Sequence, residues 1–286
     1  HPAAGALPGV FQAELTALAG KLPWDVVQDD LKGTKGSYEV RSEALLIGLV
    51  QQQIDPAAKS TGSISGDVAT QLIGIRNQIV NFIPLKPAIV AALDGIVVAH
   101  RVEKPDRWTP TLVTLSPDAK ASPVLVGIWD SGVDTAIFKD RVYTDAAGHH
   151  GFAFNLHSEP VPELLYPLGD AQARRKEEYA RLKGFLDVRA SIDSPEASAL
   201  KHYMSSLSSA QVKPTIEDLN LFGNYSHGTH VTGIAVAGNP FARIVVGRIT
   251  FDHHMIPEKP TVEQARKDAA AYQVAVDYFK KAGVRV

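Results

Sequence analysis

The sequence predicts an α/β fold, in which helices flank a parallel sheet and a mainly helical segment precedes it. Three observations support this prediction. Val124–Trp129 and Arg243–Ile249 are nearly continuous apolar runs, which is typical of strands that are buried on both faces of a parallel sheet. A long helix with clear start and stop signals, residues 261–283, follows the second run. Strand, helix and strand in succession are typical of a right-handed parallel sheet.

The composition excludes several classes of protein. Lysine and arginine total 29 against 31 acidic residues, for a formal net charge of −2. This balance argues against nucleic acid or an anionic membrane as a partner, because both favour a basic surface. The longest apolar runs, Ala44–Val50 and Val124–Trp129, are far shorter than the ~18 residues that span a bilayer, so no membrane partner is expected. Cysteine is absent, which excludes disulfides, thiolate metal sites and a cysteine nucleophile.

Residues 1–111 are expected to form a helical N-terminal extension. Two apolar sets recur at helical spacing, Phe11, Leu15, Leu18 and Leu22, and then Val68, Leu72, Ile75 and Ile79. Lys32–Gly36 and Ala57–Gly66 are rich in small and polar residues and are expected to be loops. The extension carries no cluster of histidines or carboxylates at catalytic spacing. We interpret it as a segment that packs on another part of the protein, and the alternative is a segment that binds a regulator or substrate.

Residues 112–286 are expected to form the first half of an α/β domain. Thr261 and Gln264 have the spacing of a capping box at the start of a helix, and Gly283 follows two lysines at its end. Val284–Val286 resembles the opening of a further strand. We therefore expect the remainder of the sheet to come from polypeptide outside this sequence.

An insertion interrupts this domain at about residues 159–220, after a third strand candidate, Gly151–Asn155. Asp170–Asp187 is crowded with charge, and Ser194–Ser209 is rich in serine and alanine. Both segments can form helices, but neither shows a strong apolar stripe. We therefore expect a largely solvated helical insertion.

Two motifs carry candidate catalytic side chains. Asp130-Ser-Gly-Val-Asp134 follows the strand Val124–Trp129, at the carboxyl end where functional groups gather in open α/β sheets. The second motif is Ser226-His-Gly-Thr-His-Val-Thr-Gly233, and its segment from His227 onward is expected to begin a buried helix. Its glycines, Gly228 and Gly233, permit close approach of neighbouring backbone. The histidine at position 227 can then face the carboxylate of Asp130.

Both motifs resemble those of the subtilisin-like serine proteases. Val126–Asp134 is similar to the family's aspartate motif, and His227–Gly233 is similar to its histidine motif. The resemblance covers Pro123–Asn155 and Tyr225–Val286. It implies a secreted or periplasmic serine endopeptidase that hydrolyses polypeptides with an Asp-His-Ser triad. The chain begins with His1 rather than Met, so we expect any signal peptide to have been removed.

The resemblance assigns the catalytic roles to Asp130 and His227. A serine hydroxyl needs a base to take its proton, and neutral imidazole suits that task near neutral pH. A carboxylate on the other ring nitrogen holds the required tautomer. His227 is therefore expected to act as general base and then as general acid, with Asp130 orienting it. In the family's pattern His230 is a packed structural histidine. Asp134 is expected to serve the turn.

The family's nucleophile motif, a G-T-S-M-A-like segment, and its oxyanion asparagine have no counterpart in this sequence. We therefore expect this chain alone to be inactive, and a complementing C-terminal fragment of the same protein to carry the serine. Either the protein was nicked, or the sequence is a piece of a longer one. The resemblance allows calcium, but no calcium site is readable and no cofactor is expected.

Two other interpretations remain open. One is a non-catalytic peptide-binding or scaffold module derived from a protease, which an extended peptide joins as an added strand. The other is a metallohydrolase that uses His227 and His230, although their spacing is not the helical i, i+4 pair of a metalloprotease. The pairs His149–His150 and His253–His254 are weak metal candidates, because adjacent side chains in a strand point to opposite sides. No metal site is predicted.

Overall fold

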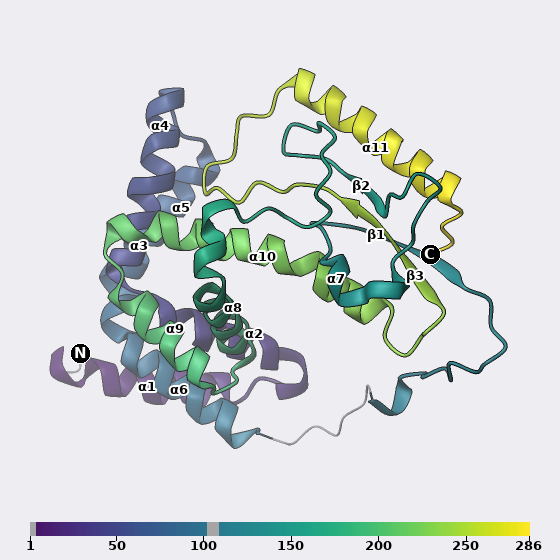
Figure 1. Cartoon of the computed structure of the whole chain (residues 1–286). Coiled ribbons are helices and arrows are strands. Elements are labelled where there is room, and N and C mark those ends of the chain that lie inside the picture. The colour runs from purple at the N-terminus through teal and green to yellow at the C-terminus, as the bar shows by residue number, and fades with distance from the viewer. Residues whose placement is uncertain (1–3, 102–108) are drawn as a thin grey trace. The chain divides into compact units, whose positions relative to one another are not determined.

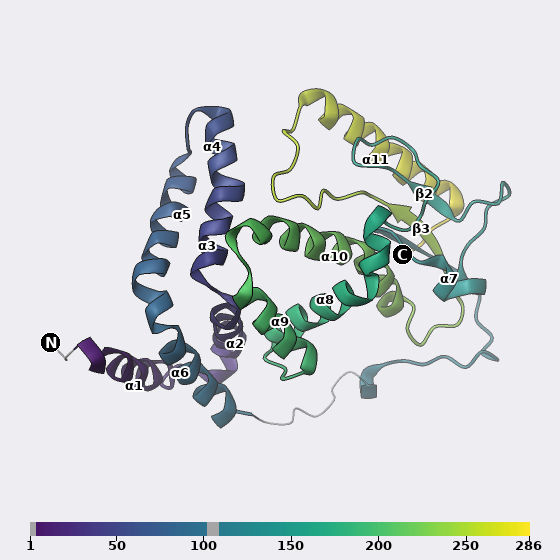
Figure 2. The same cartoon turned by 60° about the vertical axis from the view of Figure 1, so that its left-hand side comes forward.

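The computed structural model describes residues 4–101 and 109–286, so that His1 lies outside the described residues. It is mainly helical and contains a small parallel sheet, in agreement with an α/β fold at this coarse level (Figures 1 and 2). The chain divides into two compact units. The helical unit comprises His1–Lys104 and Lys176–Leu219, and the sheet unit comprises Pro105–Arg175 and Asn220–Val286.

The helical unit contains the helices expected in the first hundred residues and those of the expected insertion. Its helices are α1 (Leu7–Ala19), α2 (Trp24–Val40), α3 (Glu43–Leu49), α4 (Asp55–Thr61), α5 (Gly66–Asn77), α6 (Lys86–Ala99), most of α8 (Arg175–Ala190), α9 (Pro195–Ser206) and the start of α10 (Val212–Ala235). A short 3₁₀ turn at Ala4–Ala6 precedes α1, and short 3₁₀ and π-helical turns connect several of the other helices, at Val50–Ile54, Gln78–Phe82, Ile83–Leu85 and Ser209–Gln211.

The two loops expected within the extension are only partly present. Lys32–Gly36 lies inside α2, which corrects the sequence-based prediction. The glycine at position 36 serves packing, because a Cβ there would lie 2.6 Å from the carbonyl oxygen of Val188. Of the second segment, the part up to Thr61 belongs to α4, and the chain turns at Gly62, whose φ of 69° favours glycine.

The expectation of a solvated insertion is wrong for residues 176–219. Val188, Ala197, Leu200, Met204 and Leu207 form a buried cluster, against which Val40, Leu45 and Tyr203 pack. Helices α8 and α9 approach closely at Gly184, where a Cβ would lie 2.4 Å from the carbonyl oxygen of Glu196. The buried face therefore relies on small residues as well as large ones, which is why no strong apolar stripe was visible in the sequence.

Within the described residues, one long apolar helical stretch runs through α5 and α6. It covers Gly66–Ala99, and by length and composition alone it could cross a membrane. Polar residues interrupt this stretch, so it contains no long uninterrupted apolar run. Five residues of α6 are buried within the helical unit, namely Ala88, Ile89, Ala92, Leu93 and Ile96. The core helix of a soluble protein can have the same length and composition, so this stretch does not by itself indicate a membrane.

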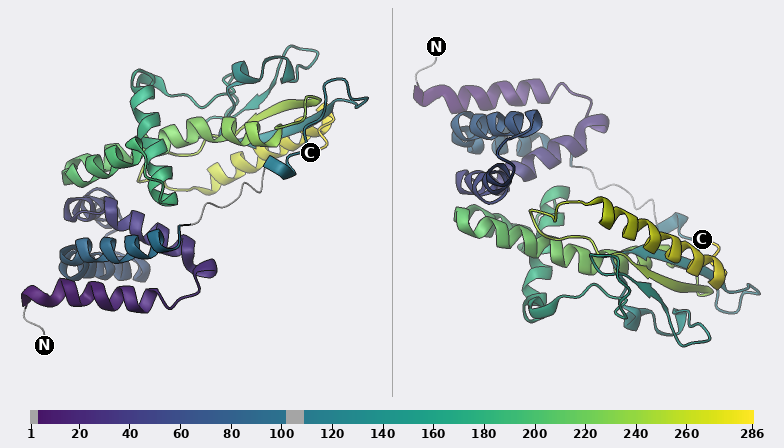
Figure 3. Two further views of the ribbon diagram at one scale, coloured as in Figure 1. Left: turned by 90° about the horizontal axis from the view of Figure 1, so that it is seen from below. Right: turned by 90° about the horizontal axis from the view of Figure 1, so that it is seen from above.

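The sheet unit is built on three parallel strands, all three expected from the sequence (Figure 3). They are β1 (Val124–Asp130), β2 (Gly151–Ala153) and β3 (Ala242–Arg248), in the order β1-β3-β2. The register pairs Asp130 with Arg248, so β1 and β3 end at the same edge of the sheet. The short helices are α7 (Thr135–Phe138) and the 3₁₀ turns Thr109–Thr111, Lys139–Arg141 and Gly169–Arg174.

The two faces of the sheet are covered differently. On one face the alternate residues Val126, Ile128, Ile244 and Val246 form a buried cluster with Val236, which directly follows α10. Over the other face lies α11 (Val262–Ala282), which runs alongside the strands in Figure 3. Side chains added at Gly127 or Gly247 would lie about 3 Å from the ring of Phe279, so these glycines leave room for that ring.

The expected ends of α11 are confirmed. The Thr261 side chain accepts a hydrogen bond from the backbone N–H of Gln264, and Gly283 ends the helix in the left-handed conformation, with φ at 83°. After the helix, the Arg285 N–H donates to the Leu125 carbonyl (3.1 Å) and the Gly127 N–H donates to the Val286 carbonyl (2.8 Å). The last residues thus begin to extend the sheet on the side of β1 away from β3.

Candidate active site

The site begins at the carboxyl end of β1. Val126 and Ile128 are buried in the core, which fixes the strand and carries Asp130 to the edge of the sheet. The chain then turns at Gly132, where φ is 120° and a Cβ would lie 2.7 Å from the carbonyl oxygen of Leu164. Only glycine fits this turn without strain.

Ser131 connects the turn after β1 to α10. Its side chain is buried, with 1% of the residue exposed. The hydroxyl donates to the carbonyl oxygen of Asn224 (2.5 Å) and accepts from the backbone N–H of Gly228 (3.3 Å). Both partners lie in α10, one turn apart, and between them comes His227. Ser131 therefore fixes the position of α10 relative to the carboxyl end of β1.

A close backbone approach completes the connection. A Cβ at Gly228 would lie 2.2 Å from the carbonyl oxygen of Gly132, a distance that no side chain can occupy. The hydroxyl of Thr229 also accepts a hydrogen bond from the backbone N–H of Asp134 (2.9 Å). The expectation of a glycine-mediated approach is confirmed at Gly228. It is wrong at Gly233, where a Cβ would meet nothing within 4 Å.

These contacts bring Asp130 and His227 together, although they are 97 residues apart in the chain. The Nδ1 atom of His227 lies 2.8 Å from Oδ1 of Asp130. The same oxygen accepts a hydrogen bond from the backbone N–H of Ser131 (2.6 Å). The carboxylate is 16% exposed and the imidazole 64% exposed, so the acid is held inside the turn while the ring reaches solvent.

This geometry selects one imidazole tautomer. An ionised carboxylate can only accept a hydrogen bond, so the proton of the neutral ring is on Nδ1 and the lone pair is on Nε2. Among the described residues, none is hydrogen-bonded to Nε2. The pair can therefore take a proton from a group presented to Nε2, with Asp130 stabilising the imidazolium that forms.

The other histidine of the motif does not have the expected place. His230 is exposed on α10, which corrects the prediction that it is packed inside. It lies one turn after His227, and the described part of the chain places no third metal ligand with these two histidines. The prediction for Asp134 is confirmed, because its side chain caps α7 by accepting from the Ala136 N–H (3.1 Å).

Arg248 is a supporting residue that the sequence analysis missed. It is 2% exposed, and its Nη1 donates to the carbonyl oxygen of Leu165 (3.0 Å). The preceding carbonyl, that of Leu164, accepts from the backbone N–H of Val133 (2.9 Å). Burial lowers the pKa of Arg248 from its usual value, and the nearby Glu163 opposes this change. The sequence feature that could have indicated this role is a charged residue, Arg248, at the end of a buried apolar strand.

The serines within the two motifs, Ser131 and Ser226, are not placed as nucleophiles. The Ser131 hydroxyl is buried between α10 and the turn, as described above. The Ser226 hydroxyl donates back into its own helix, to the carbonyl oxygen of Phe222 (2.9 Å). Neither hydroxyl is hydrogen-bonded to His227.

No model of a known protein family matches the chain, and no curated protein or solved structure matches it either. The functional argument therefore rests on the residues and their geometry.

Proposed function

We propose that the chain is the N-terminal part of a serine endopeptidase of the subtilisin type, with Asp130 and His227 as two members of its triad. One observation carries the proposal. Two residues from motifs 97 positions apart meet at a hydrogen-bond distance of 2.8 Å, with the ring atoms in the orientation that a general base needs. The parallel order of the three strands agrees with an incomplete subtilisin-like sheet.

In this proposal His227 transfers one proton twice. Nε2 takes the proton of a serine hydroxyl as its oxygen attacks the carbonyl carbon of the peptide bond. Asp130 holds the imidazolium through Nδ1 while the tetrahedral intermediate exists. His227 then gives the proton to the leaving amine as the C–N bond breaks, and water repeats the sequence to release the acyl group.

The serine and the oxyanion donor are proposed to come from polypeptide outside this chain. Neither of the serines within the two motifs, Ser131 and Ser226, is hydrogen-bonded to His227. Residues 284–286 begin to extend the sheet beside β1, so a following segment of the same protein can continue it. We therefore propose a C-terminal fragment as the partner and a polypeptide as the substrate, in a secreted or periplasmic protein.

Labelling with a fluorophosphonate, which reacts with activated serines, tests this proposal. The 286-residue chain alone is expected to remain unlabelled. The protein completed by its C-terminal part is expected to be labelled on a serine of that part, and His227→Ala is expected to abolish the labelling. Labelling of a serine within the 286 residues would contradict the proposal, as would a completed, folded protein that neither reacts nor hydrolyses peptides.

A further inference from the structure

The loop between β3 and α11 gathers three potential metal ligands in the sheet unit. It carries Asp252, His253 and His254, which lie in irregular backbone rather than in a strand. Adjacent histidines in a strand diverge, but here the two ring centroids are only 4.2 Å apart and the rings are tilted by 31°. The sequence-based argument against this pair therefore does not apply.

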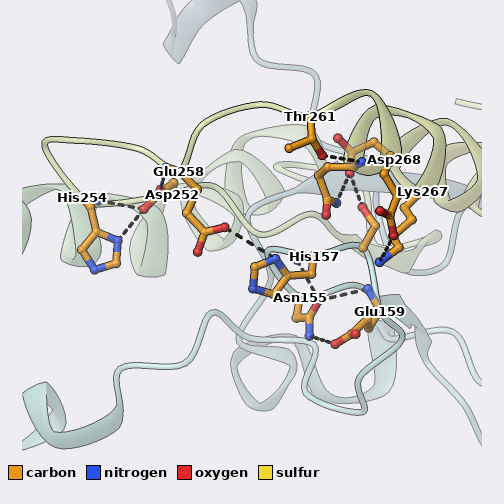
Figure 4. Close-up of polar contacts among 12 residues, drawn as sticks. Asn155, His157, Glu159, Asp252, His254, Glu258, Thr261, Lys267 and Asp268 are labelled. Atoms are coloured by element: carbon orange, nitrogen blue, oxygen red, sulfur yellow. Dashed lines mark hydrogen bonds and ion pairs between the residues drawn. The ribbon is translucent and has the colours of Figure 1, made fainter. Parts of the chain in front are cut away.

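Each of the three side chains offers one atom that can ligate a metal, and these three atoms lie within 4.8 Å of one another. Asp252 and His254 are in direct contact, with Nδ1 of the ring 2.6 Å from Oδ1 of the carboxylate (Figure 4). The neighbouring pair of Glu258 and His157 is separate, since the Glu258 carboxylate is directed toward the His157 ring at 3.8 Å. The side chain of His254 is 52% exposed, so an ion can reach the group from solvent.

The backbone of this loop is held in place from several directions. The Tyr166 hydroxyl (2.6 Å) and the Asn224 side chain (3.3 Å) both donate to the carbonyl oxygen of Phe251. The Asn220 side chain donates to the carbonyl oxygen of His253 (3.1 Å). These contacts fix the backbone on both sides of Asp252, so the ligands are presented without first ordering a flexible loop.

Hydrogen bonds to the side chains of His253 and Asp252 orient these ligands as well. The Tyr166 oxygen lies 3.4 Å from Nδ1 of His253, the kind of outer contact that orients a ligating imidazole. Asp252 accepts a backbone hydrogen bond from His254 (3.0 Å). The carboxylate is 14% exposed, so it is partly withdrawn from water and turned toward the two rings.

We propose that Asp252, His253 and His254 bind a divalent transition-metal ion of the zinc class. Two imidazole nitrogens and one carboxylate oxygen are a ligand set that zinc uses, with water in the fourth position. Calcium is not expected here, because it needs six to eight oxygen ligands. The site stabilises the loop after β3, and the proposal does not depend on a protease function.

Metal binding also changes the contact between Asp252 and His254. Ligand atoms in a tetrahedral zinc site lie about 3.3 Å apart when the bonds are near 2.0–2.1 Å. At 2.6 Å, Nδ1 of His254 and Oδ1 of Asp252 are closer than this, because they share a hydrogen. If both atoms ligate, they must move apart by roughly 0.7 Å, and the ion then takes the place of the hydrogen bond between them.

Isothermal titration of the full 286-residue chain with zinc chloride, after treatment with a chelator, tests the proposal. One zinc ion is expected to bind per chain. His253→Ala and His254→Ala are each expected to weaken binding by roughly tenfold or more. Calcium chloride is expected to give no binding at this loop.

The matched control is His149→Ala. His149 belongs to the other adjacent histidine pair of the sheet unit, and its Nδ1 lies 3.4 Å from Asp145. Its replacement is expected to leave zinc binding unchanged. A chain that binds no zinc would overturn the proposal. An equal loss in His149→Ala and His254→Ala would overturn it too. His254→Gln, which keeps the size of this exposed side chain, confirms by its melting temperature that any loss is not unfolding.

Discussion

The Cβ of any residue other than glycine at position 228 would lie 2.2 Å from the carbonyl oxygen of Gly132. This contact joins the turn after β1 to α10. His227 precedes Gly228, and Asp130 lies two residues before Gly132, so the distance between the two backbones sets the distance between the acid and the imidazole. The geometry of the candidate site therefore depends on two residues that have no functional group.

Gly228→Ala is expected to separate the two motifs. The added methyl group must push α10 away from the turn, and overpacking of this kind costs about 1–3 kcal/mol. The melting temperature should fall, and the completed enzyme should lose activity beyond its loss of folded protein.

Gly233→Ala, five residues further along the same helix, is the matched control. Gly233 is exposed and has nothing within 4 Å of a Cβ, so alanine should raise stability by about 0.5–1 kcal/mol through its helix propensity. If both variants changed stability equally, the contact at Gly132 would not control the site.

The sequence predicted the sheet and the candidate site better than it predicted the helical unit. The strands were visible because Ile244, Val245 and Val246 are all fully buried, which demands a continuous apolar run. The pairing of Asp130 with His227 followed from the two motifs. The distance between them depends on Gly132 and Gly228, and only the latter was recognised as a close approach.

Other features were hidden because tertiary contacts decide them. The glycines within α2 and α8 signalled a loop or carried no signal, whereas Gly36 and Gly184 let neighbouring backbone approach. The exposure of His230 reflects which side of α10 faces the described core. His253 and His254 can approach each other because β3 ends at Arg248 and both lie in the loop beyond it. The apolar pattern of the sequence did not show where this strand ends.

Leu200→Ala tests whether the expected insertion is part of the core of the helical unit. Leu200 is 2% exposed and belongs to the cluster formed by α8, α9 and their neighbours. Its truncation leaves a cavity and should cost about 2–5 kcal/mol, measured by denaturant unfolding. Leu186→Ala is the control, because Leu186 is 55% exposed and its loss should change stability by no more than about 0.5 kcal/mol. A small effect of Leu200→Ala would restore the interpretation of a solvated segment.

Ionisation of Tyr278 is expected to lower the stability of the protein at alkaline pH. Burial and the nearby Asp145, whose carboxylate accepts a hydrogen bond from the hydroxyl at 3.2 Å, raise the pKa of Tyr278 from 10.0 to about 12. A raised pKa means that the folded state favours the protonated phenol. This contribution is complete below pH 10.0 and is lost as the pH rises toward about 12.

Tyr278→Phe cannot ionise, so its unfolding free energy should fall less steeply over that range than that of the parent protein. Urea unfolding at a series of alkaline pH values measures the two slopes. Parallel slopes would show that the phenol does not contribute.

Asp130→Asn is expected to preserve the shape of the site and remove its activity. An asparagine amide can donate to Nδ1 of His227, which would place the ring proton on Nε2 and leave no base there. The completed enzyme should lose turnover by roughly 10⁴-fold with little change in melting temperature. A variant that kept more than a tenth of the turnover would show that the carboxylate does not orient the ring.

The central claim is that His227, held by Asp130, is the general base, and comparison of the two histidines of the motif tests it most directly. Peptide hydrolysis by the completed enzyme should fall by roughly 10⁴-fold or more in His227→Ala. In His230→Ala, both the rate and the melting temperature should stay close to those of the parent protein, because His230 is exposed. The opposite result, in which His230→Ala abolishes hydrolysis and His227→Ala only weakens it, would contradict the account and assign the base to the second histidine.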